Sequence, residues 1–440
     1  MDLRKVEEIV NDSKGGIIEK KDAILSTFNN SNSNSNSDSD APDDPPVDSA
    51  TALQLFLDHI PISSILGIHN SPPSTGQYLA ICDGIKMLYE KNVNGALIDD
   101  ASHDPTTNFT SYNTRSFSHP YIAFISFSNM LLWSLQEFRK HQAAFKIDHD
   151  TKGLKKKNKP NGFFSLLDKI PAVSLAKIGE LAASFLWNPV FPVKPDQSLF
   201  HVLLLLSKHR LSVVPVTEHF SSKVVGYVTE HSVNHILLQS SGLEWFDSIA
   251  DKPLSDFRFE NSDQIVSIYN DESIAKVVDM LWNNKVCAIA VVEREMEKLI
   301  GCVRVCDIHH LLDDDHIFTE REDTSVEQFI HTFNNKQQKY EEEDEEVGAL
   351  ALNNKFEPRP VTNSERDTLK QSMKSLAEKK SNFSFVVDEC GRVKGMITLR
   401  DILMEFAPPC MDSRIDGGSF FDMALKESGC AIRDGTMVHI

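Results

Sequence analysis

The chain has 440 residues, of which 41% are hydrophobic and 25% are charged, and its formal net charge is −19. This length suits about two to four domains, and the charged fraction is that of a globular protein rather than of a chain disordered throughout. The acidic excess argues against a general nucleic-acid or anionic-lipid surface, because both kinds of surface need cationic side chains that face phosphate.

The cysteines and the apolar runs indicate a soluble protein of a reducing compartment. Seven cysteines form an odd set without C-x-x-C spacing, so neither a disulfide framework nor a zinc finger is indicated. They are Cys82, Cys287, Cys302, Cys306, Cys390, Cys410 and Cys430. The longest apolar runs, such as Val202 to Leu206, are too short to span a membrane. We expect a cytoplasmic location and no membrane partner.

Polar segments separate the foldable parts. Residues 1–50 contain the run NNSNSNSNSDSD and bury too little apolar surface to offset the entropy of ordering, so we expect disorder there. Residues 100–118 and the acidic run at 341–346 are predicted loops. The lysine-rich stretch within residues 141–170 is interpreted as a solvated linker, with nuclear import or a kinase-facing loop as alternatives. Residues 408–440 form a tail of weak periodicity.

Between these segments one pattern occurs four times: a helix, an apolar run, a turn, a second apolar run and another helix. Leu199, Val202, Leu203 and Leu206 illustrate the single apolar face of such a helix. The predicted first helices are Tyr78–Glu90, Ser198–His209, Glu272–Asn284 and Glu365–Lys380, with Asp196, Asp271 and Asn363 as predicted caps of the last three.

The predicted strand pairs are Val93–Ile98 with Tyr121–Ile125, Ser212–Val216 with Val224–Val228, Val286–Val292 with Leu299–Val303, and Ser384–Val387 with Val393–Ile397. The closing helices are Met130–Phe138, Val233–Leu238, Ile308–Leu312 and Ile402–Phe406. We expect repeats over residues 51–140, 171–245, 246–316 and 317–407. One such unit cannot cover both faces of its sheet, so the units must pack on one another.

The fourth unit reads SFVVDECGRVKGMITLRDILMEF from Ser384 to Phe406 and ends in Gly-x-h-Thr-x-x-Asp-h, where h is apolar. This unit resembles the cystathionine-β-synthase (CBS) domain. CAIAVVEREMEKLIGCVRVCDIHHLL and LSVVPVTEHFSSKVVGYVTEHSVNHIL resemble it less closely, and the first unit is divergent. Four such units over Thr51 to Phe406 resemble the gamma, energy-sensing subunit of AMP-activated and sucrose-nonfermenting-type kinases. FHVLLLLSKHRLSVVPV and SSGLEWFDS are similar to the plant gamma subunits in particular.

This resemblance implies an α/β (α+β) fold of four tandem β-α-β-β-α repeats paired into two modules. It also implies a non-catalytic regulatory subunit that assembles with a kinase catalytic alpha subunit and a beta scaffold, and that takes an adenine nucleotide (AMP, ADP or ATP) as regulatory ligand. No P-loop, Gly-x-Ser-x-Gly or kinase catalytic signature occurs. The alternative is a free-standing CBS module that binds an adenosyl ligand and regulates a non-kinase enzyme.

The motif implies a place for the ligand. An Asp in the first helical turn can accept hydrogen bonds from both ribose hydroxyls, while the Thr hydroxyl and the free helix N–H groups face phosphate. The same two residues can also simply cap the helix, so both interpretations stay open. The fourth motif is complete, with Gly395, Thr398 and Asp401. The third has Gly301, Arg304 and Asp307, the second Gly226, Thr229 and Ser232, and the first Ala123, Ser126 and Asn129.

The positions that the resemblance assigns to phosphate binding differ from those of the family. Where gamma subunits carry Arg or His-Arg pairs, this chain has Asn94, Ser212-Val213, Cys287 and Asn382-Phe383. Cationic substitutes at other positions are Lys208, His209, Arg210, Arg304, Lys394 and Arg400. We therefore expect weak nucleotide binding, carried by Thr398 and Asp401, with Asp307 as second-best acceptor and Arg304 and Arg400 in support.

A metal site is not expected. His309 and His310 precede Asp313, Asp314, Asp315 and His316, but adjacent helical side chains point roughly 100° apart and should not share one ion.

Overall fold

The computed structural model describes residues 49–65, 74–99, 121–150, 162–167, 170–179, 188–209, 211–219, 223–259, 265–337, 360–407, 430–433 and 436–439. The predictions for the Asn/Ser run, the loop at 100–118, the acidic run and residues 408–429 lie outside these ranges. Among the described helices, none has both the length and the apolar character that a membrane crossing requires.

The described part of the chain contains four units with one order of elements, named units 1 to 4 along the sequence. A short strand leads into a helix, an antiparallel hairpin follows, and a further helical segment closes the unit. The short strand pairs in parallel with the first hairpin strand in units 1, 3 and 4. In unit 2 it is reduced to a parallel bridge between Val193 and Val216. The predicted β-α-β-β-α repeats are thus confirmed.

The units have the following bounds. Unit 1 consists of β1 (Ser74–Gly76), α3 (Ile81–Glu90), β2 (Gly95–Asp99), β3 (Tyr121–Ser126) and α4 (Phe127–Asp150). Unit 2 consists of α8 (Leu199–Lys208), β5 (Val213–Thr217), β6 (Val224–Thr229) and α9 (Glu230–Gln239). Unit 3 consists of β7 (Ser267–Tyr269), α11 (Ile274–Asn284), β8 (Ala288–Val292), β9 (Leu299–Arg304), η3 (Val305–His309) and α12 (His310–Asp313). Unit 4 consists of β10 (Thr362–Asn363), α15 (Leu369–Glu378), β11 (Phe383–Val387), β12 (Val393–Thr398) and α16 (Leu399–Glu405).

The remaining described elements connect or flank the units. They are α2 (Ser49–Asp58), η1 (Ile62–Ser64), α5 (Gly162–Leu167), α6 (Pro171–Ser174), β4 (Asn188–Pro189), α10 (Glu244–Ala250), η2 (Leu254–Asp256), α13 (Asp315–Thr319), α14 (Val326–Gln337), β13 (Cys430–Arg433) and β14 (Thr436–His439). Helix α4 continues ten residues beyond position 140, where the sequence predicts the end of the first repeat.

The helices begin later than the predicted caps, which are Asp196, Asp271 and Asn363. Ser273 and Thr368 are the N-caps of α11 and α15, and their side chains accept hydrogen bonds from backbone N–H groups of the first turn. Asp271 lies outside the helix and accepts two hydrogen bonds from Arg294 instead. The cap prediction is wrong because the Ser or Thr directly before the apolar face satisfies the same N–H groups.

Consecutive units pair through their sheets. Leu97 of unit 1 packs in one buried cluster with Val213 and Tyr227 of unit 2. In the other module, Cys302 of unit 3 shares a cluster with Phe385 of unit 4, and the two hairpins are joined by an antiparallel bridge between Lys298 and Arg392. Units 1 and 2 therefore form one module, and units 3 and 4 form the second, as predicted.

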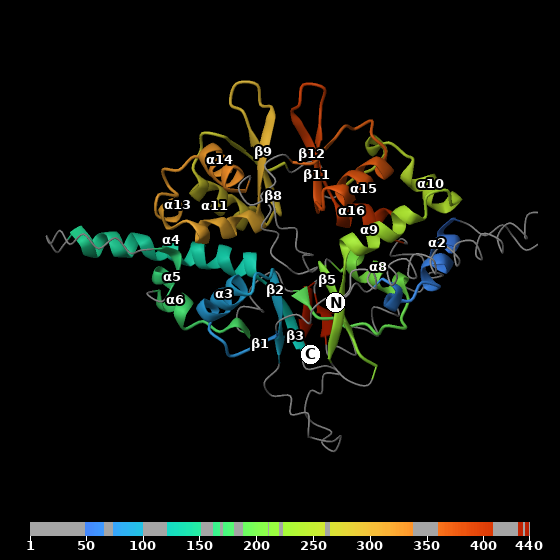
Figure 1. Cartoon of the computed structure of the whole chain (residues 1–440), viewed down its shortest axis with the longest axis horizontal. Helices are drawn as coiled ribbons and strands as arrows, with labels where there is room; N and C mark the ends of the chain where they lie inside the picture. Colours follow the sequence, from blue (N-terminus) through green and yellow to red (C-terminus); the bar gives the residue numbers. More distant parts are fainter. Residues whose placement is uncertain are drawn as a thin grey trace, which may run out of the picture.

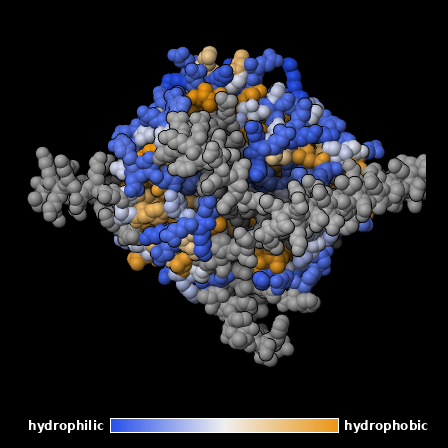
Figure 2. All heavy atoms as spheres, in the orientation of Figure 1, coloured by the Kyte–Doolittle hydropathy of each residue, from blue (hydrophilic) through white to orange (hydrophobic). Residues whose placement is uncertain are grey.

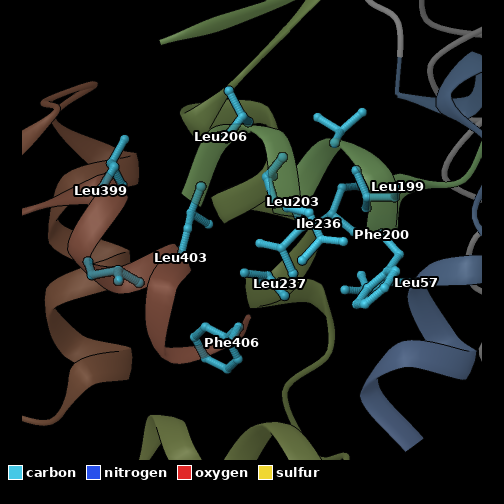
Figure 3. Packing of buried hydrophobic residues seen from close by; sticks show 14 of the residues in the cluster. Leu57, Leu199, Phe200, Leu203, Leu206, Ile236, Leu237, Leu399, Leu403 and Phe406 are labelled. Carbon is cyan, nitrogen blue, oxygen red and sulfur yellow. The ribbon is translucent and has the colours of Figure 1, made fainter. Parts of the chain in front are cut away.

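The two modules pack against each other through their helices (Figure 1). One large core joins units 1 and 3, and includes Leu131 and Phe318. The other joins units 2 and 4. Figure 3 shows Leu203, Leu237 and Leu403 of that core meeting from α8, α9 and α16. Polar residues cover most of the described surface in Figure 2, where apolar residues appear in small separate groups.

Each module is also tied together by crossing segments. The segment after α2 reaches unit 2, where the Ile62 N–H donates to the Gln197 carbonyl at 2.9 Å. The segment between the two units returns to unit 1, where the Ile81 N–H donates to Ala176 at 3.1 Å. The second module repeats both crossings, from Leu254 N–H to Asp367 at 2.8 Å and from Ile274 N–H to Thr324 at 3.0 Å. Each unit is therefore completed by backbone that belongs to its partner in the module.

Candidate ligand-binding site at the fourth motif

The fourth motif lies where strand β12 passes into helix α16. Thr398 is the N-cap of the helix, and its hydroxyl oxygen accepts a hydrogen bond from the Asp401 N–H at 3.2 Å. In return, the Asp401 carboxylate accepts from the Thr398 N–H at 2.8 Å and from its hydroxyl at 2.6 Å. The two residues form a capping box, so they fix each other whether or not a ligand is present.

The Asp401 carboxylate keeps acceptor capacity after capping. Asp401 is 5% exposed, and both hydrogen bonds that its carboxylate accepts from described residues end on Oδ2. Each carboxylate oxygen has two acceptor positions, which leaves Oδ1 available to a hydroxyl donor. The capping and ligand interpretations of this motif are therefore compatible in one geometry.

Arg400 of α16 links the fourth motif to the end of α8 in unit 2. The Arg400 Nε donates to the Ser207 carbonyl at the end of α8, at 3.2 Å, and so carries its guanidinium to unit 2. Burial, Lys208 and Arg400 together lower the pKa of His209 to about 4, so this imidazole is neutral at pH 7. Lys208 and Arg400 are thus cations at the contact between α8 and α16, next to the fourth motif.

Glu230, the first residue of α9, faces the same site. Burial raises the pKa of Glu230 to about 8, and the Asp401 carboxylate also acts in that direction while Arg400 opposes it. Near pH 7 the group is therefore mostly protonated and can donate a hydrogen bond. Sequence reasoning missed Glu230, although it directly follows Thr229 of the second motif, because nothing in the sequence indicates that units 2 and 4 meet there.

Cys287 occupies one of the positions where the family carries a phosphate anchor. The residue as a whole is exposed, but its thiol is desolvated, and this raises the pKa of the thiol to about 12, with Glu230 and Asp401 acting in the same direction. Its carbonyl accepts from the Val305 N–H at 2.8 Å, just as the Asn382 carbonyl accepts from Leu399 at 2.8 Å. These positions do adjoin the helix N-termini, but they present a neutral thiol and an amide.

In the third motif, Arg304 forms an ion pair with Asp307. The Arg304 side chain donates to both Asp307 oxygens, from Nε at 3.0 and 3.1 Å and from Nη2 at 2.6 Å. The Arg304 backbone N–H adds a further bond at 2.8 Å. Asp307 is 1% exposed, so its carboxylate is enclosed and paired. Arg304 thus occupies the Asp307 carboxylate, which the sequence predicts as the second-best acceptor for ribose hydroxyls.

The first and second motifs lack a carboxylate at this place. In unit 2 the Ser232 N–H donates to the Thr229 hydroxyl at 3.4 Å, which caps α9. In unit 1, Ser126 ends β3 and Asn129 lies in the first turn of α4. Of the other cations named from the sequence, Lys394 pairs with Asp388 in the hairpin of unit 4 at 3.7 Å. Arg210 lies outside the described residues.

His309 and His310 do not diverge as expected. Their ring centroids are 4.0 Å apart, with the rings tilted by 37°. The reason is local: the His309 Nδ1 donates back to the Cys306 carbonyl, and the His310 ring is bound to Asp313. The expectation of separated rings was wrong because it assumed a regular α-helix, whereas His309 ends a 3-10 segment and His310 begins α12.

Parts of the chain match a known family and curated proteins. The CBS-domain family matches residues 180–238 and 357–408, which include the second and fourth motifs. The chain is 24% identical over 315 residues to the SNF1-related protein kinase regulatory subunit gamma-1 of Arabidopsis thaliana, covering 68% of this chain and 72% of that protein. It is 32% identical over 232 residues to the gamma-1-like subunit of the same plant, covering 51% of this chain and 48% of that protein.

Solved structures also align with the chain. A Methanocaldococcus jannaschii protein described as an archaeal homologue of gamma-AMPK aligns over 79% of this chain and 100% of its own, with a TM-score of 0.47 and 15% identity. CBSX2 in complex with AMP aligns over 34% of this chain and 92% of its own, with a TM-score of 0.22 and 17% identity.

The family model identifies CBS-domain sequence in units 2 and 4, and units 1 and 3 have the same order of elements. Among CBS-domain proteins, the chain resembles the plant gamma regulatory subunits of SNF1-related protein kinase. It spans about half the length of the gamma-1-like relative.

Proposed function

We propose that this chain is the gamma-type subunit of a heterotrimeric, energy-responsive Ser/Thr protein kinase complex in the cytoplasm. Its partners would be a kinase catalytic alpha subunit and a beta scaffold. The observation that carries the proposal is the similarity to regulatory subunit gamma-1 over 72% of that protein's length, together with four units arranged as two modules.

Co-purification tests the assembly. The full chain, expressed in plant cells and isolated under native conditions, should bring down one kinase polypeptide and one scaffold polypeptide in stoichiometric amounts. Recovery of a non-kinase enzyme at equal stoichiometry would overturn the kinase assignment. That result would instead support a CBS module that binds an adenosyl ligand and regulates another enzyme.

We further propose that an adenine nucleotide binds weakly at the fourth motif. Asp401 Oδ1 would accept from the ribose hydroxyls, while Lys208 and Arg400 would face the phosphates. Two cations are fewer than a polyphosphate can engage, and Cys287 and Asn382 add no charge, so a preference for adenosine-like ligands over ATP is expected. The third motif takes no part in this proposal, because Arg304 occupies Asp307.

The substitution Asp401→Ala tests the nucleotide site. It removes two hydrogen bonds to a charged acceptor, each worth roughly 1.5–3 kcal/mol, so calorimetry should show an affinity reduced at least about 100-fold. Ser232→Ala, at the equivalent place in unit 2, is the matched control and should leave affinity unchanged. Circular dichroism at the assay temperature verifies that each variant is folded.

The two proposals fail separately. Tight ATP binding that Asp401→Ala leaves intact would place the ligand elsewhere in the molecule. If AMP, ADP, ATP and adenosine all give no heat of binding while the kinase complex still assembles, the nucleotide proposal is overturned and the kinase-subunit proposal stands.

A further inference from the structure

A second polar cluster lies where unit 3 packs on unit 1. His309 and His310 belong to unit 3 and are 3% and 7% exposed, respectively. Asp313 follows one turn later, and the Tyr89 hydroxyl of α3 in unit 1 donates to its Oδ1 at 2.6 Å. One ligand atom from each of His309, His310 and Asp313 can be chosen so that all three lie within 4.8 Å of one another.

The hydrogen bond of His309 determines which ring nitrogen can bind an ion. Its Nδ1 contacts the Cys306 carbonyl oxygen, and a carbonyl oxygen only accepts. In the neutral ring Nδ1 must therefore carry the proton, and Nε2 keeps its lone pair. Histidine ligands in metal sites are held in the same way, by a carbonyl or carboxylate on the other ring nitrogen.

His310 and Asp313 are already at nearly the separation of two ligands of one ion. The His310 Nδ1 lies 2.8 Å from Asp313 Oδ2. Two ligand atoms that are each about 2.0–2.2 Å from a zinc ion lie roughly 3–3.5 Å apart, so a small opening admits the ion between them. The Nδ1 proton moves to Nε2 of the same ring, which conserves the proton count. Phe333 stacks on this ring, with centroids 4.6 Å apart, and fixes its plane.

We propose that His309, His310 and Asp313 bind one divalent first-row metal ion, with zinc as the representative ion. Two imidazole nitrogens and a carboxylate oxygen suit zinc, with water completing the coordination. The Asp313 side chain is 34% exposed and gives the ion a route from solvent. Because Tyr89 holds Asp313 from unit 1, the bound ion would fasten the two modules to each other.

Zinc binding to tag-free full-length protein tests the site, with equilibrium dialysis and elemental analysis as the measurement. His309→Gln and Asp313→Asn should each weaken zinc binding at least tenfold and abolish the rise in melting temperature that zinc produces in the wild type. His316→Gln is the matched control, because His316 is an exposed histidine of the neighbouring α13. It should bind zinc as the wild type does.

X-ray absorption of the zinc-loaded wild type needs no variant, and so is independent of any folding defect. It should show two imidazole nitrogens with oxygen ligands and no sulfur. The proposal is overturned if the wild type binds no zinc, if both variants retain wild-type zinc affinity, or if the spectrum shows thiolate sulfur or a single imidazole.

Discussion

At the scale of single residues, one motif position serves three different purposes within this chain. Asp401 caps its helix through Oδ2, and its Oδ1 remains able to accept a hydrogen bond. Asp307 is held by Arg304 through both oxygens, and Ser232 has no carboxylate. With Arg in place of Thr, the equivalent carboxylate of unit 3 is therefore one partner of an internal ion pair. Both units keep the junction of strand and helical segment, although unit 3 continues as a 3-10 segment and unit 4 as an α-helix.

Arg304→Ala should destabilise the protein strongly, because it leaves the Asp307 carboxylate enclosed without its cation. Breaking one partner of such a pair costs about 3–5 kcal/mol, measurable as a reduced free energy of unfolding in urea. Arg294→Ala is the matched control, since its pair with Asp271 is exposed and should change the free energy of unfolding far less. Equal losses in the two variants would contradict the enclosed pairing.

At the scale of elements, the crossings show that a helix can belong to one unit in sequence and to another in space. Helix α2 precedes unit 1 but packs on α8 of unit 2 and on α10. Figure 3 shows Leu57 of α2 beside Leu199 and Phe200 of α8. The centroid of the Trp245 ring of α10 lies 5.3 Å from that of Phe56, and both Trp245 and Phe246 are buried in the core.

Leu57→Ala tests this placement of α2. Leu57 is completely buried, and truncating a buried leucine costs about 2–5 kcal/mol. Leu55→Ala, two positions earlier in the same helix, is the control, because Leu55 is 41% exposed and should cost less than about 0.5 kcal/mol. Chemical denaturation of both variants measures the difference. Similar values would mean that α2 does not use this face.

The elements themselves were largely predictable, and their partners were not. The strands of units 2 to 4 lie where β-branched runs alternate with turns, for example Val286–Val292 against the observed Ala288–Val292. Local periodicity determines such elements. It carries no information about which unit contacts which, so the approach of Glu230 to Asp401 could not be foreseen. The pairing of Arg304 with Asp307 could not be foreseen either, because the presence of Arg in place of Thr does not specify a side-chain rotamer.

At the scale of the whole molecule, the junction of units 2, 3 and 4 brings together ionisable groups from three units. Glu230 comes from unit 2, Cys287 from unit 3, and Arg400 and Asp401 from unit 4. Each unit contributes the start of a closing helix or the residue just before a first hairpin strand. Any ligand in this region therefore senses the relative position of both modules.

Stability should fall as the pH rises from 6.5 to 8. Burial raises the pKa of Glu230 from 4.5 to about 8, so across this interval the folded state holds a proton that the unfolded state has lost. His209 has the opposite effect, but only below 6.5, because burial lowers its pKa from 6.5 to about 4.

Melting temperatures at pH 6.5 and pH 8, for the wild type and for Glu230→Gln, provide the measurement. The variant cannot titrate and should lose less stability over this interval. An identical pH profile in the two proteins would show that Glu230 is ionised throughout.

The reciprocal crossings also decide how the protein responds to being cut. A break between residues 150 and 162 divides the first module in sequence, but each piece still contributes backbone that completes the other, through Ile62 with Gln197 and Ile81 with Ala176. The pieces should consequently remain associated after cleavage and elute as one species on gel filtration. A single repeat expressed alone would lack the segment that its partner supplies. The smallest part of the chain that should fold independently is thus a pair of repeats.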